Sequence, residues 1–269
     1  MTSTTEQVTT NDGLRLLTRH WIQRDPKGRI LLVHGLGEHS GRYEHVAEHL
    51  NEHRFDVSAF DLRGHGASGG ERVDLNTFSE YLDDLELVFA SLPQDLPTVI
   101  YGHSMGGLIA TSYAVTDRPQ PSLYVLSAPA LAADVPAPLR IASKLLARIR
   151  PGMRLPNSIK GEQLSRDPAV GERYFADPLV VTKGTARFGT VLLAQIARIT
   201  DQLDAFATPA LVIHGADDEL VPPHASAPLA AIPGVERKLF PGLRHETHNE
   251  PEQKEVLGFV VAWLEGQLA

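Results

Sequence analysis

Short apolar runs alternate along the chain with segments whose apolar residues recur at helical spacing. Polar or glycine-rich residues directly follow several of the runs, at 34–35, 61, 104 and 214–215. Short buried strands that alternate with helices are typical of a mostly parallel sheet with helices on both faces, which binds ligands at the carboxyl edge of its strands. We therefore predict an α/β fold, with strands at 14–21, 30–33, 57–60, 98–101, 123–126, 210–213 and 235–240, and helices at 43–50, 78–92, 108–114 and 251–268.

The alternation stops between approximately residues 130 and 200. Prolines divide this stretch into short helical pieces, and no convincing strand is visible in it. Because the stretch lies between two core strands, we expect one domain over residues 1–269, with a helical cap of approximately 130–200 inserted over the carboxyl edge of the sheet.

Within the expected cap, residues 139–149 carry apolar residues at helical spacing among basic ones. This pattern is typical of an amphipathic helix that lies on a lipid surface, and we expect contact with lipid here. An ordinary cap helix packed on the core is the alternative. The apolar residues are Leu139, Ile141, Leu145, Leu146 and Ile149, and the basic residues are Arg140, Lys144, Arg148 and Arg150.

The 269 residues are 42% hydrophobic, enough for the core of one large α/β domain. A formal net charge of −8 argues against a nucleic-acid partner, because phosphate backbones attract basic proteins. The absence of cysteine excludes disulfides, thiolate metal sites and a cysteine nucleophile.

No Sec signal peptide is visible, and no apolar stretch approaches the roughly 20 residues that span a bilayer. We expect a soluble cytoplasmic protein with peripheral lipid contact through the cap, and the oligomeric state stays open.

Three glycines surround Ser104 in the segment GHSMGG, residues 102–107. An extended run leads into this segment and a helical run leads out, so the serine lies at a tight strand-to-helix turn. Such a turn needs a strained backbone and tiny residues two positions before and after the serine, because strand and helix almost touch there. Gly102 and Gly106 occupy these positions. The pattern favours a nucleophilic serine over a glycine-rich turn with an incidental serine.

A serine nucleophile needs a base, and the base needs an acid that holds its tautomer. In this arrangement the acid follows a late strand and the histidine follows the last strand. The segment LVIHGADDELVP offers Asp217 and Asp218, and LFPGLRHETHNEP offers His245 and His248. The order along the chain predicts a triad of Ser104, one of the two aspartates, and His245.

The triad also needs amides that stabilise negative charge on the attacked carbonyl oxygen. One of these amides should follow the nucleophile, which makes it Met105. The other should come from the loop after an early strand, here HGLGEHSGRY, and the Leu36 amide is our candidate.

With these motifs the sequence resembles the monoacylglycerol lipase family of the α/β-hydrolase superfamily, in particular its bacterial members. HGLGEHSGRY is the most specific of them, because related esterases and peptidases carry other residues after His-Gly. The matching segments span nearly the whole chain: HGLGEHSGRY (34–43), DLRGHGASGG (61–70), GHSMGG (102–107), LSAPA (126–130), SRDP (165–168), DPLV (177–180), HGADDELVP (214–222) and GLRHETHNEP (242–251). The resemblance implies the α/β-hydrolase fold with a helical cap over the catalytic edge.

The resemblance also assigns residues to the site. The family acid lies three residues after the motif glycine, here Gly215, which selects Asp218, and the family histidine matches His245. The cysteines near the site of mammalian members are absent from this chain. The family residues that hold the glycerol head match Glu38, Arg42, Tyr174 and His248.

The activity that the resemblance implies is hydrolysis of monoacylglycerols to a free fatty acid and glycerol through an acyl-enzyme, without cofactor or metal. A general carboxylesterase or a lysophospholipase on the same triad is the alternative. A proline iminopeptidase would need acidic cap residues, for which Glu162 and Glu172 are weak candidates. A non-catalytic binding protein of this fold usually lacks a triad member, and none is missing here.

Overall fold

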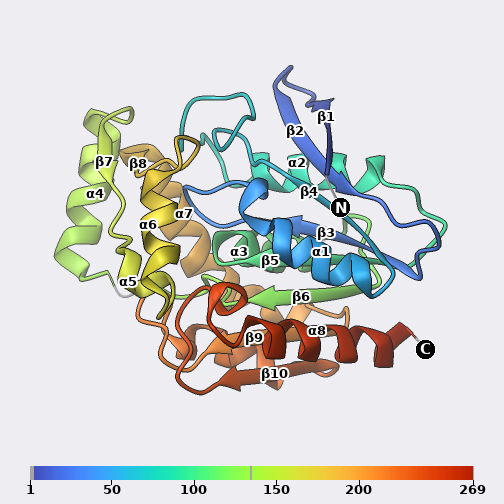
Figure 1. The fold of residues 1–269 in the computed structure, drawn as a ribbon. Helices are drawn as coiled ribbons and strands as arrows, with labels where there is room; N and C mark the ends of the chain where they lie inside the picture. Colours follow the sequence, from blue (N-terminus) through green and yellow to red (C-terminus); the bar gives the residue numbers. More distant parts are fainter. Residues whose placement is uncertain (1–2, 134, 269) are drawn as a thin grey trace.

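The computed structural model describes residues 3–133 and 135–268, without the side chains at 137, 139 and 140. An eight-stranded sheet with the order β1-β2-β4-β3-β5-β6-β9-β10 forms its centre. The strands from β4 to β10 in this order run parallel, and the antiparallel hairpin β1–β2 extends one end (Figure 1). The strands are β1 (Thr4–Thr9), β2 (Arg15–Trp21), β3 (Gly28–Val33), β4 (Phe55–Phe60), β5 (Thr98–His103), β6 (Leu123–Ser127), β9 (Ala210–Gly215) and β10 (Val235–Phe240).

Helices cover both faces of the sheet, and side chains that alternate along each strand pack against them. In β3, Ile30 packs in the same hydrophobic layer as α1 and α8, and Leu31 packs in the layer of α2 and α3. This mostly parallel sheet between two helical layers confirms the predicted fold class (Figure 1). The covering helices are α1 (Glu44–Glu52), α2 (Ser79–Ser91), α3 (Met105–Ala114) and α8 (Gln253–Leu268), and the short 3-10 helices outside the insertion are η1 (Ser40–Tyr43), η3 (Pro223–Ala231) and η4 (Thr247–Asn249).

The predicted strands and helices of these layers are present, with ends that differ by a few residues. No strand was predicted before residue 14, but Thr4–Thr9 form β1. Nearly all side chains of β1 are exposed, so no hydrophobic alternation marks it. Backbone pairing with β2 and the β-branched threonines explain why this polar segment is a strand.

Between β6 and β9 the chain leaves the sheet and forms a mostly helical insertion, which we define as residues 128–209. The expectation that no strand occurs here was wrong, because β7 and β8 pair as a small antiparallel sheet. Each has only three residues, too few for a hydrophobic period to show. The elements are α4 (Ala137–Ile149), β7 (Arg154–Pro156), α5 (Gly161–Leu164), α6 (Pro168–Ala176), β8 (Lys183–Thr185), α7 (Ala186–Ile199) and η2 (Thr200–Ala205).

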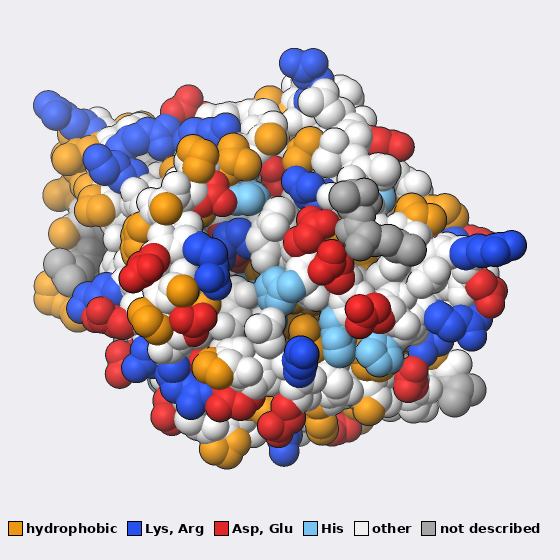
Figure 2. All heavy atoms as spheres, viewed as in Figure 1, with side chains coloured by type: hydrophobic (Ala, Val, Ile, Leu, Met, Phe, Trp, Pro, Cys, Tyr) orange, Lys and Arg blue, Asp and Glu red, His pale blue; other side chains and the backbone are white. Residues whose placement is uncertain are grey.

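Helix α4 lies at the outer side of the insertion and packs against α7 (Figure 1). Its residues Ile141, Leu145 and Ile149 are 68%, 58% and 67% exposed, so an apolar stripe faces outward. Basic side chains flank this stripe, and orange and blue atoms lie together at the left of Figure 2. Within the part of the chain that the structure describes, no helix is both long and apolar enough to cross a membrane.

Candidate active site

Ser104 lies between β5 and α3 with a φ of 54°, in the left-handed region that residues with a side chain rarely adopt. Its glycine neighbours are required by close backbone contacts. A Cβ added to Gly102 would lie 2.4 Å from the Gly106 carbonyl oxygen, and one added to Gly106 would lie 2.1 Å from the Val33 carbonyl oxygen. No side chain fits at either position, so glycine is needed to hold the serine at this turn.

His245 contacts both Ser104 and Asp218 through its two ring nitrogens. Its Nε2 lies 2.9 Å from the Ser104 hydroxyl oxygen, and its Nδ1 lies 2.7 Å from Oδ2 of Asp218. The other carboxylate oxygen of Asp218 accepts two backbone amides of the following turn, each at 2.9 Å. Neighbouring Asp217 is exposed. The structure therefore brings three predicted residues together and places Asp218, not Asp217, beside the histidine.

The pKa values of Asp218 and His245 are shifted in opposite directions, each toward the charged form. Burial acts to raise the pKa of Asp218, but the His245 ring and the hydrogen bonds to this carboxylate outweigh burial and lower it. Burial acts to lower the pKa of His245, but the charge and hydrogen bond of Asp218 raise it above its ordinary value. An ionised Asp218 only accepts hydrogen bonds, so Nδ1 of His245 carries a proton. In the neutral ring, Nε2 is then free to accept from the Ser104 hydroxyl.

The loop after β3 lies against the serine turn. A Cβ added to Gly35 would lie 3.3 Å from the Cβ of Ser104, and Leu36 lines the cavity beside this serine. Glu38 holds the loop, because its Oε1 accepts the Gly35 amide at 2.6 Å. Among the described residues the Leu36 amide has no acceptor. The Met105 amide begins α3, where the first amides have no partner within the helix.

The same loop is also tied to the insertion. His39 Nε2 lies 2.9 Å from Oδ2 of Asp177, which follows α6. The Val181 amide donates to the Gly37 carbonyl at 2.7 Å. The position of Leu36 therefore depends on contacts from the insertion as well as from the sheet.

The four residues assigned to the glycerol head divide into two groups. Glu38 and Tyr174 line the cavity at Ser104, whereas Arg42 and His248 are not among its lining residues. Arg42 binds Glu246 through two hydrogen bonds of 2.7 and 2.8 Å, pairs with Glu38, and lies over the Tyr174 ring. His248 is buried and stacks on a buried tyrosine. Glu246 was not predicted, although its position next to the predicted histidine was a signal.

The cavity beside Ser104 has a volume of about 20 Å³, close to the space of one water molecule. The sheet side contributes Ser104 and His245, and the insertion contributes Ile159, Leu164 and Tyr174. Apolar side chains of the insertion therefore line the same small cavity as the serine and the histidine.

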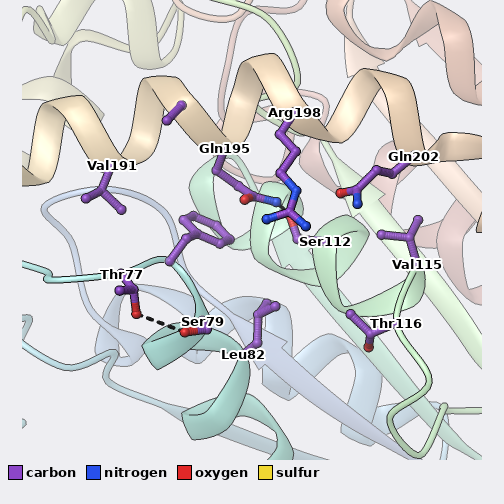
Figure 3. Close-up of a pocket in the computed structure, with 12 residues that line it drawn as sticks. Thr77, Ser79, Leu82, Ser112, Val115, Thr116, Val191, Gln195, Arg198 and Gln202 are labelled. Carbon is purple, nitrogen blue, oxygen red and sulfur yellow. Dashed lines mark hydrogen bonds between the residues drawn. The ribbon is translucent and has the colours of Figure 1, made fainter. Parts of the chain in front are cut away.

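A larger groove of about 360 Å³ lies between α2, α3 and α7 (Figure 3). Gln195 of α7 donates to the Ser112 hydroxyl of α3 at 2.9 Å, and Arg198 points into the groove beside it. None of the predicted site residues lines this groove. Ser112 is about 12 Å along α3 from Ser104, so the groove is separate from the triad. The described residues include no group of three or more His, Asp or Glu side chains arranged to hold a metal ion.

Comparisons with known proteins extend over nearly the whole chain. Residues 24–252 match the family described as serine aminopeptidase, S33. A monoacylglycerol lipase of Mycolicibacterium smegmatis is 38% identical in an alignment that covers 95% of each chain. A phospholipase of Bacillus subtilis is 30% identical and covers 88% of this chain and 94% of its own length. The crystal structure of a monoacylglycerol lipase from Paleococcus ferrophilus matches with a TM-score of 0.84 at 31% identity, over 99% of this chain and 100% of the other.

The geometry of the site and the length of these matches agree. The serine turn, the buried His–Asp pair and the parallel strands of the sheet, from β3 to β10, lie within one continuous matched region, residues 24–252. The chain belongs to the family described as serine aminopeptidase, S33, and within the α/β-hydrolases to the monoacylglycerol lipase family.

Proposed function

We propose that this protein is a serine hydrolase that cleaves monoacylglycerols to a free fatty acid and glycerol. The observation that carries the proposal is the continuous chain of contacts from the Ser104 hydroxyl through His245 to Asp218. The ester class is supported by the Mycolicibacterium smegmatis relative and by the Paleococcus ferrophilus structure, both of which are monoacylglycerol lipases.

In the proposed mechanism, His245 removes the proton of Ser104 as the serine oxygen attacks the ester carbonyl. The amides of Leu36 and Met105 stabilise the negative charge on the carbonyl oxygen, and each such donor is typically worth roughly 3–4 kcal/mol. His245 then protonates the departing glycerol. A water molecule activated by the same histidine hydrolyses the acyl-enzyme, and Asp218 orients the ring and stabilises its charged form.

We propose that the insertion acts as the cap, and that the cap moves when substrate binds. A volume of about 20 Å³ has no room for an acyl ester. The apolar side chains of Ile159 and Leu164 take up the space above the serine and belong to the insertion. Their displacement would open an apolar channel for the acyl chain, with Glu38 and Tyr174 left at its polar end for the glycerol head.

We propose further that α4 rests on the lipid surface from which the substrate is drawn. Its outward stripe of Ile141, Leu145 and Ile149 is apolar, and Lys144 and Arg148 stand exposed beside it. An apolar face flanked by basic side chains fits the boundary between acyl chains and acidic headgroups. The side chains at 139 and 140 lie outside the described residues and carry no part of this proposal.

Purified protein and its Ser104→Ala variant should be compared on monoacylglycerol, diacylglycerol, triacylglycerol and lysophosphatidylcholine. We expect rapid turnover of monoacylglycerol by the wild type alone. Preference for lysophosphatidylcholine would instead support the alternative of a lysophospholipase, which the phospholipase relative from Bacillus subtilis favours. Equal turnover of unrelated short esters, with no preference for monoacylglycerol, would indicate a general carboxylesterase.

The description of the matched family also raises an aminopeptidase activity. A peptidase of that kind would need an acidic group in the cap to bind the substrate amine. The acidic candidates Glu162 and Glu172 are both exposed and do not line the cavity at Ser104. The structure therefore offers little support for this alternative, and adding an aminoacyl amide to the substrate comparison tests it.

A further inference from the structure

His214 is a second histidine in contact with the carboxylate of Asp218. It lies in β9, four residues before Asp218, and its side chain is completely buried. Its Nε2 lies 3.2 Å from Oδ2 of Asp218, the same oxygen that contacts His245, and 2.8 Å from the Val221 carbonyl oxygen. One carboxylate oxygen is therefore shared by two imidazole rings, of which the mechanism uses only one.

The partners of His214 place a proton on Nε2 of its ring. A carbonyl oxygen and an ionised carboxylate only accept hydrogen bonds, so Nε2 must be the donor toward Val221 and Asp218. Nδ1 lies 2.8 Å from the hydroxyl oxygen of Ser226. That oxygen also accepts from Nε of Arg237 at 3.0 Å, and its one proton has two acceptors within reach, Nδ1 of His214 and the Pro223 carbonyl oxygen at 3.2 Å. Whichever acceptor the Ser226 proton takes, Nε2 of His214 carries a proton and donates toward Asp218.

Close backbone packing brings the loop of Asp218 to the loop of His245. A Cβ added to Gly215 would lie 2.2 Å from the carbonyl oxygen of Arg244, the residue before His245. The two loops therefore touch without an intervening side chain. In this arrangement, His214 approaches Asp218 from the strand while His245 approaches from the facing loop.

We propose that His214 is a positioning residue of the triad: it holds Asp218 in place and, by sharing its charge, limits how strongly Asp218 stabilises protonated His245. This inference rests on the proposed function. An N–H group donated to a carboxylate oxygen draws off part of its charge, so less remains for a second cationic partner. Without that donor, more charge faces His245, and the histidine becomes harder to deprotonate.

The other groups that face His245 do not change when residue 214 is substituted. They are Glu38 from the loop after β3, Glu246 from its own loop, and His103, whose ring centre lies 4.8 Å away. His245 acts as base only when neutral, so activity falls at low pH as the ring takes up a proton. We call this low-pH decline in rate the acid limb of the pH–rate profile. A shift of the acid limb in a variant at position 214 therefore reports the charge that Asp218 presents to His245.

The experiment compares His214→Gln, His214→Asn and His214→Phe with the wild type. The Gln amide reaches the position of Nε2 and can still donate to Asp218, whereas the Asn amide is one carbon shorter, and Phe keeps the ring without a donor. Two rates are measured against pH: kcat/KM on a soluble short-chain ester, and the labelling of Ser104 by a fluorophosphonate. Melting curves and circular dichroism show whether each variant is folded.

We expect the acid limb of both rates to move up by about half a pH unit or more in the Asn and Phe variants, and to stay within about 0.2 unit of the wild type in the Gln variant. An unshifted limb in the folded Asn or Phe variant would overturn the proposal, as would equal shifts in Gln and Asn. If neither amide variant folds, His214 has a structural role only and the proposal is wrong. Failure of the proposed function looks different. Without a working triad, the wild-type protein itself would neither hydrolyse the ester nor react with the fluorophosphonate. With a working triad but another substrate, the wild type would hydrolyse the short ester and show no preference for monoacylglycerol.

Discussion

The catalytic edge of the sheet and helix α4 place their polar and apolar groups in opposite ways. At the edge, Ser104, Asp218 and His245 are buried, and each polar side chain has a specific partner. On α4, Ile141 and Ile149 are exposed although they are apolar. Buried polar groups cost free energy unless they are paired, and exposed apolar surface costs about 25 cal/mol per Å². The polar groups of the edge are therefore paired within the protein, whereas the apolar stripe of α4 is exposed, as the proposed contact with lipid would require.

The strongest test of the edge is removal of the nucleophile. Ser104→Ala should lower ester turnover by about 10⁴-fold or more, because no other group at the edge can form the acyl-enzyme. The melting temperature should change little, since only one hydroxyl is lost. Turnover with purified protein and labelling by a fluorophosphonate provide the measurement. A folded Ser104→Ala protein with substantial residual turnover would exclude the assignment.

The next test separates the two adjacent aspartates, between which the order along the chain does not choose and the family resemblance selects Asp218. Removing a triad carboxylate can cost on the order of 10⁴-fold in turnover, because the histidine loses its tautomer and its charge partner. We expect Asp218→Asn to lose at least about 100-fold in kcat, and the matched control Asp217→Asn, at an exposed position, to stay within about tenfold. Both kcat values are measured on one soluble ester, with melting curves. The opposite ranking would move the acid to Asp217.

Backbone packing distinguishes the two regions as well, and a pair of glycine substitutions tests it. A Cβ at position 106 would collide with the Val33 carbonyl oxygen, while Gly152, just after α4, has no atom within 4 Å of an added Cβ. We expect Gly106→Ala to lower the free energy of unfolding by about 3 kcal/mol, and Gly152→Ala to change it by less than about 0.5 kcal/mol. Urea unfolding measures both. Equal stabilities would show that the turn at Ser104 is looser than the contacts imply.

The sequence predicts the catalytic edge well because its requirements are local. The glycines at 102 and 106 follow from steric contacts within one turn, and the resemblance to the family, through the spacing from Gly215, selects Asp218. The strands β1, β7 and β8 could not be predicted in this way. β1 has no buried face, and β7 and β8 have only three residues each, so backbone pairing with distant segments decides their conformation.

The partners behind the triad also depend on the tertiary fold. Arg42 and Glu246 lie 204 positions apart in the chain, and no local pattern indicates that they pair. His214 precedes Asp218 by four residues, a spacing visible in the sequence, but its contact with the carboxylate depends on the turn after β9. Sequence motifs therefore identify the reacting groups more readily than the groups that hold them.

Helix α4 should respond to changes that leave the edge untouched. Replacing Ile141, Leu145 and Ile149 together by serine should lower binding to anionic vesicles by about tenfold or more, because the apolar face that we propose to enter the lipid is lost. Activity on a soluble short ester should stay unchanged. The matched control is Leu146→Ser, at a half-buried position, which should lower the melting temperature instead. Unchanged vesicle binding by the triple variant would contradict lipid contact through α4.

The smallest expected effect is the pH dependence of the edge. Asp218 raises the pKa of His245 above its ordinary value, and the histidine is active as base only when it is neutral. As pH falls through this raised pKa, the ring takes up a proton and kcat/KM declines, whereas Asp218, with its lowered pKa, stays ionised throughout. The acid limb of kcat/KM on a soluble ester should therefore lie above pH 6.5, the ordinary value for histidine.

The triple serine variant of α4 should show the same acid limb, because no contact joins the described side chains of α4 to His245. A limb below pH 6.5 in the wild type would mean that desolvation, rather than Asp218, dominates the environment of the base.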